Sequence, residues 1–229
     1  MKLLAVETAT EACSAALLVN GEITEQFTFT DNGHSKLILP MIDSLLADAG
    51  LQPSDLDGLA FGCGPGSFTG VRIATGIIQG IAFALALPVM PVSNLAAVAQ
   101  DFFDHNDEGL AFVAMDARMN EIYWAVYQRN TEGYAELLGK ETVIAASTIE
   151  FPDRDGVGIG TGWNAYSQEL LTRLSHRIIR YESDNLPRAM AVARLATEGF
   201  KLGLAVPVEH AMPIYLRDKV AKKECERTR

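Results

Sequence analysis

Three short segments open the chain, two of them apolar and the third alternating, and each has the length of a β-strand. They are Lys2–Val6, Cys13–Val19 and Glu22–Thr30. The Asn20-Gly21 pair between the last two runs is typical of a tight hairpin. Apolar residues from Leu37 to Ala49 then recur at helical spacing, and Gly58–Gly62 forms another short apolar run. The pattern predicts three antiparallel strands, a helix and a fourth strand.

A glycine-rich loop follows the fourth strand and leads into a helix. Its glycines include Gly64, Gly66 and Gly70, a density that is needed where the backbone takes positive φ or where another group comes very close. Ser67 or Thr69 can cap the first turn of the helix, because a side-chain oxygen there accepts hydrogen bonds from free backbone N–H groups.

This helix is apolar nearly all round, since Arg72 and Gln79 are its only strongly polar residues before Pro88 ends it. Such a helix lies in a large core, spans a membrane or is covered by a partner. A transmembrane helix needs roughly 20 apolar residues. This run is shorter and contains Arg72 and glycines, so we do not expect it to span a membrane. The other two readings stay open.

Residues spaced by four give this helix a distinct face. Gly76, Gly80 and Ala84 fall on one line, where another helix backbone could come close. Beside them lies a row of isoleucines, Ile73, Ile77 and Ile81. One side of the helix can therefore face the domain's own sheet and the other side a second protein.

The order of elements recurs in the second half of the chain. Val89–Val92 predicts a strand, Ser93 caps a helix to about Phe103, and the polar segment 104–109 predicts a junction. The strands predicted beyond it are Ala111–Met115, Glu121–Gln128, Tyr134–Leu138 and Val157–Gly160. The helices predicted there are Ser147–Phe151, Asn164–Ser175 and Arg188–Leu204, and Pro213–Arg217 closes the fold.

Two β-β-β-α-β-α subdomains, 1–103 and 104–229, therefore make up the predicted α/β fold, with helix 188–204 packing back on the first. Each carries an acid at the end of its first strand, Glu7 and Asp116. The arrangement is similar to the actin-like ATPase and sugar kinase superfamily, whose fold is ribonuclease H-like and whose nucleotide binds between the halves.

Charge and cysteine usage narrow the function classes. The net charge is −10, but residues 217–229 carry +3, which leaves −13 on the body. An acidic body repels phosphate backbones, so any work on RNA goes through a basic partner. Cys13, Cys63 and Cys225 form no C-x-x-C pair, and no secretory signal opens the chain, which predicts reduced thiols and a cytoplasmic protein.

The sequence lacks the common catalytic motifs. The glycine loop lacks the lysine of a P-loop, and Ser67 lacks the flanking glycines of a nucleophile elbow. No two of the four histidines stand at i, i+3 or i, i+4, so no helix presents an imidazole pair to a metal. Glu7 and Asp116, as strand-end acids, are the candidates to hold Mg²⁺ through water.

Three segments resemble the TsaB (YeaZ) family. They are the block from Gly64 to Arg72, GPGSFTGVR, the opening AVETAT from Ala5 to Thr10, and Pro213–Arg217. The resemblance covers nearly the whole chain. It implies a non-catalytic paralogue of the TsaD enzyme, which binds metal through an H-x-x-x-H pair that this sequence lacks. The implied function is to activate TsaD in threonylcarbamoyl transfer to adenosine 37 of tRNAs that read codons beginning with A.

The resemblance also implies partners and site residues. It predicts a heterodimer with TsaD, work alongside the ATPase TsaE, a homodimer when the chain is alone, and tRNA contact only through the complex. The interface residues carried over are Leu37, Met41, Leu45, Arg72, Gly76, Ile77, Gly80, Ile81 and Ala84. Glu7, Thr8 and Asp116 would mark a vestigial nucleotide cleft beside the loop of Gly64, Gly66, Ser67 and Gly70.

No cofactor is required by the chain itself, and nucleotide or Mg²⁺ at the subunit interface is compatible with the resemblance. The alternative function is an enzyme with the actin-like fold, either a glycoprotease-type peptidase or a nucleotide-binding phosphotransferase.

Overall fold

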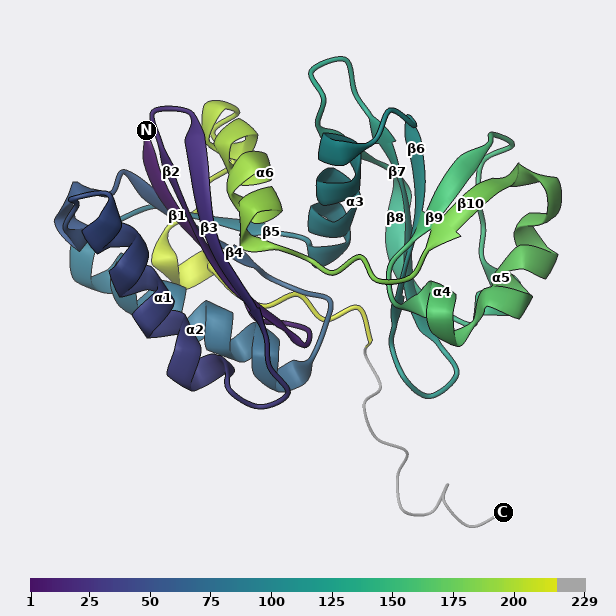
Figure 1. Cartoon of the computed structure of the whole chain (residues 1–229), viewed down its shortest axis with the longest axis horizontal. Helices are drawn as coiled ribbons and strands as arrows, with labels where there is room; N and C mark the ends of the chain where they lie inside the picture. Colours follow the sequence, from purple (N-terminus) through teal and green to yellow (C-terminus); the bar gives the residue numbers. More distant parts are fainter. Residues whose placement is uncertain (218–229) are drawn as a thin grey trace, which may run out of the picture.

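The computed structural model describes residues 1–217 and contains two five-stranded sheets (Figure 1). The first sheet has the strand order β3-β2-β1-β4-β5. Its strands are β1 (Lys2–Glu7), β2 (Ala12–Val19), β3 (Glu22–Phe29), β4 (Gly58–Gly62) and β5 (Val89–Val92). β1, β2 and β3 are antiparallel neighbours, whereas β4 and β5 join parallel to β1.

The second sheet repeats this connectivity with the order β8-β7-β6-β9-β10. Its strands are β6 (Leu110–Asp116), β7 (Ile122–Arg129), β8 (Ala135–Ile144), β9 (Gly156–Ile159) and β10 (Ile178–Glu182). β6, β7 and β8 are again antiparallel neighbours, and β9 and β10 again run parallel to β6. The repeat agrees with the predicted duplication.

Helices cover both faces of each sheet (Figure 1). The long helices are α1 (His34–Asp48), α2 (Phe68–Leu85), α3 (Asn94–His105) and α6 (Ala189–Lys201). The outer side of the second sheet carries the short α4 (Gly162–Ala165) and α5 (Ser167–Leu174). α1 and α2 pack on one face of the first sheet and α6 on the other, while α3 packs on the second sheet. α3 and α6 meet between the two sheets.

The helix that was expected to complete the first subdomain therefore packs elsewhere. Leu95, Val98 and Phe102 of α3 lie against Val113 of β6 in the core of the second sheet. A boundary at residue 103 does not describe this packing, because the apolar face of α3 is buried by the half of the chain that follows it.

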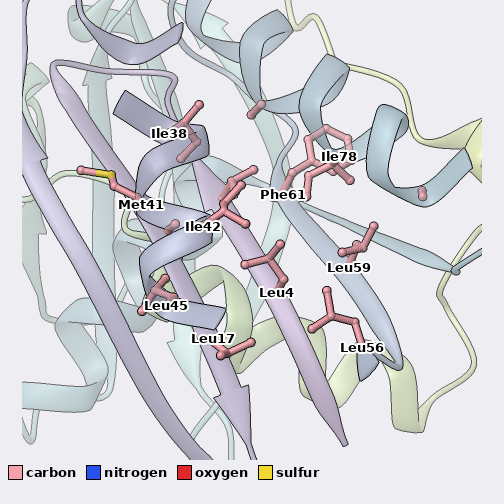
Figure 2. Packing of buried hydrophobic residues seen from close by; sticks show 14 of the residues in the cluster. Leu4, Leu17, Ile38, Met41, Ile42, Leu45, Leu56, Leu59, Phe61 and Ile78 are labelled. Carbon is pink, nitrogen blue, oxygen red and sulfur yellow. The ribbon is translucent and has the colours of Figure 1, made fainter. Parts of the chain in front are cut away.

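Along each central strand, successive side chains point to opposite faces of the sheet, and each face is covered by different helices. Leu4 and Val6 of β1 point toward α1 and α2, whereas Leu3 and Ala5 point toward α6, since successive side chains of a strand lie on opposite faces. Figure 2 shows the first of these cores, with α1 residues facing Leu4 and Leu17 of the sheet. Both faces are covered, so β2 is apolar almost throughout.

Three predictions about the second half were wrong or incomplete. β10 was missed, because its sequence IIRYE is short and half polar. Residues 147–151 form no α-helix but a 3₁₀ turn, η2 (Ala146–Thr148). The helix expected from Asn164 to Ser175 is divided into α4 and α5. The remaining 3₁₀ turns are η1 (Pro53–Asp55), η3 (Ser175–Arg177) and η4 (Val208–His210).

Candidate interaction surface and interlobe cleft

The glycine loop is held against the loop that follows β1. Ser67, one of the two candidate caps, accepts a hydrogen bond from the Gly70 N–H at 3.4 Å, and its own N–H donates to Ala9 O at 2.7 Å. The Thr8 hydroxyl donates to Gly70 O at 2.7 Å. A Cβ on Gly70 would lie 2.0 Å from Thr8 O, so no larger residue fits here without displacing backbone.

α2 presents one face to the sheet and leaves the other open. Val71, Ala74 and Ile78 are buried. On the opposite side a Cβ built on Gly76 or Gly80 would meet nothing within 4 Å. The reading in which a single core surrounds this helix therefore does not hold.

Large apolar side chains continue the open face of α2. Phe83 is 80% exposed and Phe68 is 61% exposed, and Ala84 is exposed as well. Ile77 and Ile81, at the margin of this face, are partly buried against the core. Within residues 1–217, α2 is the helix long and apolar enough to cross a membrane by length and composition alone. In the structure α2 packs on β1 and β4, as a helix of a folded domain does.

An extended C-terminal segment lies beside α2 and adds to the same surface. Gln79 donates to Ala211 O at 2.8 Å, and the Ile214 N–H donates to Cys63 O at 2.8 Å, which fixes the segment along the helix. Its side chains Met212, Ile214 and Tyr215 remain about half exposed. The guanidinium of Arg72 stacks on the rings of Phe68 and Tyr215. Sequence reasoning missed this contribution, because the apolar letters of 212–216 do not show which element they lie against.

Two residues carried over from the resemblance are not on this surface. Met41 and Leu45 of α1 are 9% and 2% exposed, and both pack into the core between α1 and the sheet (Figure 2). Their helical spacing marks the buried face of α1, so they offer nothing to a partner here. Leu37 is partly buried, and Leu39 is the large apolar side chain that α1 exposes.

A cleft of about 870 Å³ separates the two halves. Its walls include Gly66, Ser67, Gly70 and Ile73 from the first half and Asp116, Tyr123 and Asn164 from the second. The acids that line it are Glu11, Asp31, Asp116 and Asp184. Arg118 also lines the cleft, and its guanidinium forms an ion pair with Asp116 at 3.2 Å.

Glu7 and Thr8 do not line this cleft, although both were expected to. Each is fully buried, beneath the loop that forms the wall, and Gly64 is buried as well. Of the two strand-end acids only Asp116 reaches the cleft. Glu7 and Asp116 therefore do not come together as a Mg²⁺ pair in the cleft, since Glu7 is buried and Asp116 lines it alone.

Buried titratable groups near the loop are held neutral. Burial raises the pKa of Glu7 to about 8 against the lowering effect of hydrogen bonds from backbone N–H groups at Ala9 and Thr8. Burial likewise raises the pKa of the Cys13 and Cys63 thiols to about 11 and about 12. A nucleophilic cysteine needs the opposite shift. No cluster of three His, Cys, Asp or Glu side chains within the described part of the chain could hold a metal.

Comparison with known proteins decides the family. The model of the TsaD family, described as tRNA N6-adenosine threonylcarbamoyltransferase, matches residues 28–225. A protein of Escherichia coli K12 named "tRNA threonylcarbamoyladenosine biosynthesis protein TsaB" is 40% identical over 98% of both chains. The chain belongs to the TsaB family. The Haemophilus influenzae TsaB is 39% identical, over 98% of this chain and 97% of its own.

Solved structures of the same family confirm the actin-like fold. YeaZ from Pseudomonas aeruginosa is similar with a TM-score of 0.87 at 40% identity, and the match covers 94% of this chain and 99% of that one. The predicted recognition of the TsaB (YeaZ) family is therefore confirmed, and so is the predicted fold class.

Proposed function

We propose that this chain is a non-catalytic partner that activates a TsaD-type enzyme in threonylcarbamoyl transfer to adenosine 37 of tRNA. The observation that carries the proposal is the open apolar face of α2, on which Gly76 and Gly80 leave room for another backbone. Contiguous exposed apolar surface on a folded domain marks a site of association. The names of the TsaB relatives support the pathway to which the association belongs.

The proposed interface differs from the one inferred from sequence. It keeps Leu37, Arg72, Gly76, Gly80 and Ala84, with Ile77 and Ile81 at its margin, and it gives up Met41 and Leu45. It gains the exposed side chains beside α2, which are Phe68, Phe83, Met212, Ile214 and Tyr215. Aromatic residues and arginine are enriched among the residues that carry most binding energy, which favours a centre near Arg72.

The same face would serve a homodimer when the chain is alone, and the TsaE-type ATPase would join the heterodimer. Contact with tRNA would go through the assembly, because the body of the chain carries −13. The site of action would be the cytoplasm. The basic segment 218–229 lies outside the described residues.

The enzyme alternative has less support. Within residues 1–217 the histidines, thiols and acids build no metal cluster, and the thiols of Cys13 and Cys63 are shifted away from reactivity. A phosphotransferase would have to bind nucleotide in a cleft lined by four carboxylates and one arginine.

Reconstitution tests the proposal. The chain is mixed with a TsaD-type enzyme, a TsaE-type ATPase, threonylcarbamoyl-adenylate and substrate tRNA, and modified adenosine is measured by mass spectrometry of digested tRNA. We expect modification only when both the chain and the TsaD-type enzyme are present. Robust transfer by the chain alone, abolished by Ser67→Ala or Cys63→Ala, would contradict the proposal. So would full transfer by the other components without this chain.

A further inference from the structure

Two buried oxygen atoms converge on the space above Gly62. A Cβ built on that glycine would lie 1.5 Å from Glu7 Oε2 and 2.3 Å from Asn94 Oδ1. Both oxygens are inaccessible to solvent, and neither has a hydrogen-bond partner among the described residues. Two buried acceptors without a donor are costly, and a hydrogen carried by one of them removes this cost.

The identity of that oxygen follows from the other bonds of the two side chains. The amide nitrogen of Asn94 donates to Pro65 O at 3.0 Å, and its oxygen lies beside Gly62, as Glu7 Oε2 does. Glu7 Oε1 accepts the Ala9 N–H at 2.6 Å. Glu7 Oε2 is therefore the atom that can carry a proton.

We propose that Glu7 is a structural proton site, whose neutral carboxyl group donates from Oε2 to Asn94 Oδ1 and thereby clamps the glycine loop. Through Asn94 the clamp holds one end of the loop, since the Asn94 N–H donates to Gly64 O at 2.9 Å. Through Ala9 it holds the other end, where Ala9 O accepts the Ser67 N–H. Gly62 is glycine because any side chain would occupy the space of the shared hydrogen.

The surroundings of Glu7 support a neutral group. Burial is the largest cause of its raised pKa, about 8. The titratable groups that face it are the Cys13 thiol on β2 and the Cys63 thiol after β4, and Glu141 of β8 lies near Cys63. None of the three brings a positive charge that would stabilise a carboxylate.

The sign of the pH dependence follows from linkage. In the unfolded chain Glu7 ionises near its ordinary pKa of 4.5, whereas in the folded chain its pKa of about 8 keeps the proton on the carboxyl group. Between these values the folded state binds one more proton than the unfolded state, so Glu7 lowers stability as pH rises. Its contribution is complete below pH 4.5 and stops changing above about pH 8.

Glu7→Gln tests the site, because glutamine keeps the shape and can donate from its amide to Asn94 Oδ1 without titrating. We expect the unfolding constant of the wild type, relative to that of the variant, to rise about tenfold for each pH unit between 5 and 7. The variant should therefore have the higher melting temperature at pH 7. A ratio that stays flat over this range would overturn the proposal.

Infrared difference spectroscopy supplies a second readout. At pH 7 the wild type should show the C=O stretch of a protonated carboxyl that Glu7→Gln lacks, and Asn94→Ala should shift that band because the acceptor is gone. If the band is missing, Glu7 does not carry the proposed proton. If the band is not shifted in Asn94→Ala, Asn94 is not the acceptor of its hydrogen bond.

Asp116→Asn is the matched control. It removes the strand-end acid of the second sheet, which lies in the cleft beside Arg118, and should neither remove the band nor change the pH dependence. All these measurements use the isolated full-length chain, so the proton site can fail without affecting the proposed partner function, and the reverse also holds.

Discussion

The guanidinium carbon of Arg72 lies 3.2 Å from the centre of the Phe68 ring, one turn earlier on α2. Its Nη1 also donates to Phe68 O at 3.2 Å, and the Tyr215 ring lies 5.1 Å away on another side. No acid within residues 1–217 forms an ion pair with it. The side chain is thus held in place on the apolar face before any partner arrives, which lowers the entropy cost of using it.

Arg72→Ala should weaken partner binding with little effect on folding. Truncation of an interface hot spot costs about 2 kcal/mol or more, which is roughly 30-fold in dissociation constant. Calorimetric titration with the TsaD-type enzyme measures the affinity, and thermal unfolding measures stability. Arg154→Ala, an exposed arginine of the second half, is the control and should bind normally. Unchanged affinity of the Arg72 variant would remove it from the proposed interface.

Leu45→Ala should destabilise the fold instead. The side chain is 2% exposed, and removing a buried leucine typically costs about 2–5 kcal/mol. Urea unfolding should show this loss, while Leu39→Ala, at an exposed position of the same helix, should stay within about 0.5 kcal/mol of wild type. If both variants lose equally little free energy of unfolding, Leu45 is not a core residue and belongs to the interface.

Cys13 and Cys63 should resist alkylation while the chain is folded. Their pKa values of about 11 and about 12 leave almost no thiolate at pH 8, and both side chains are buried. Peptide mapping after iodoacetamide treatment should find these two sites unmodified in buffer and modified in urea. Rapid native labelling of Cys63 would reopen the possibility of a reactive thiol in the glycine loop.

Periodicity was sufficient to predict most of the first half. The hairpin at Asn20-Gly21, the helical spacing of α1 and the cap at Ser67 depend on neighbours close in sequence, and the structure has all three. The open face of α2 was one of two alternatives that the sequence left open, and the free space beside Gly76 and Gly80 decides between them.

Long-range packing was not predictable in the same way. α3 looks alike whether it covers its own sheet or the next one, since its apolar stripe of Leu95, Val98 and Phe102 is the same in both cases. Met41 and Leu45 could not be assigned either, because apolar residues at helical spacing mark a core face and an interface equally well. The burial of Glu7 could not be predicted either, because it depends on Gly62 and Asn94, which lie far from Glu7 in the sequence and next to it in the structure.

Gly80→Leu separates the interface from the core most sharply. A leucine at position 80 starts from a Cβ with no neighbour within 4 Å, so the monomer has no packing to lose. Replacing a helix glycine also raises helix propensity by about 1 kcal/mol. At a helix-to-helix contact the same side chain would overpack by about 1–3 kcal/mol, which weakens association roughly five- to 150-fold.

We therefore expect Gly80→Leu to be a folded monomer with a normal or raised melting temperature that no longer self-associates or binds the TsaD-type enzyme. Size-exclusion chromatography with light scattering measures the first property, and pull-down with the partner measures the second. Gly70→Ala is the contrast within the same helix, since its Cβ would lie 2.0 Å from Thr8 O and should lower the melting temperature. If Gly80→Leu unfolds, or if it still binds the partner at normal affinity, the open face of α2 is not where the two proteins meet.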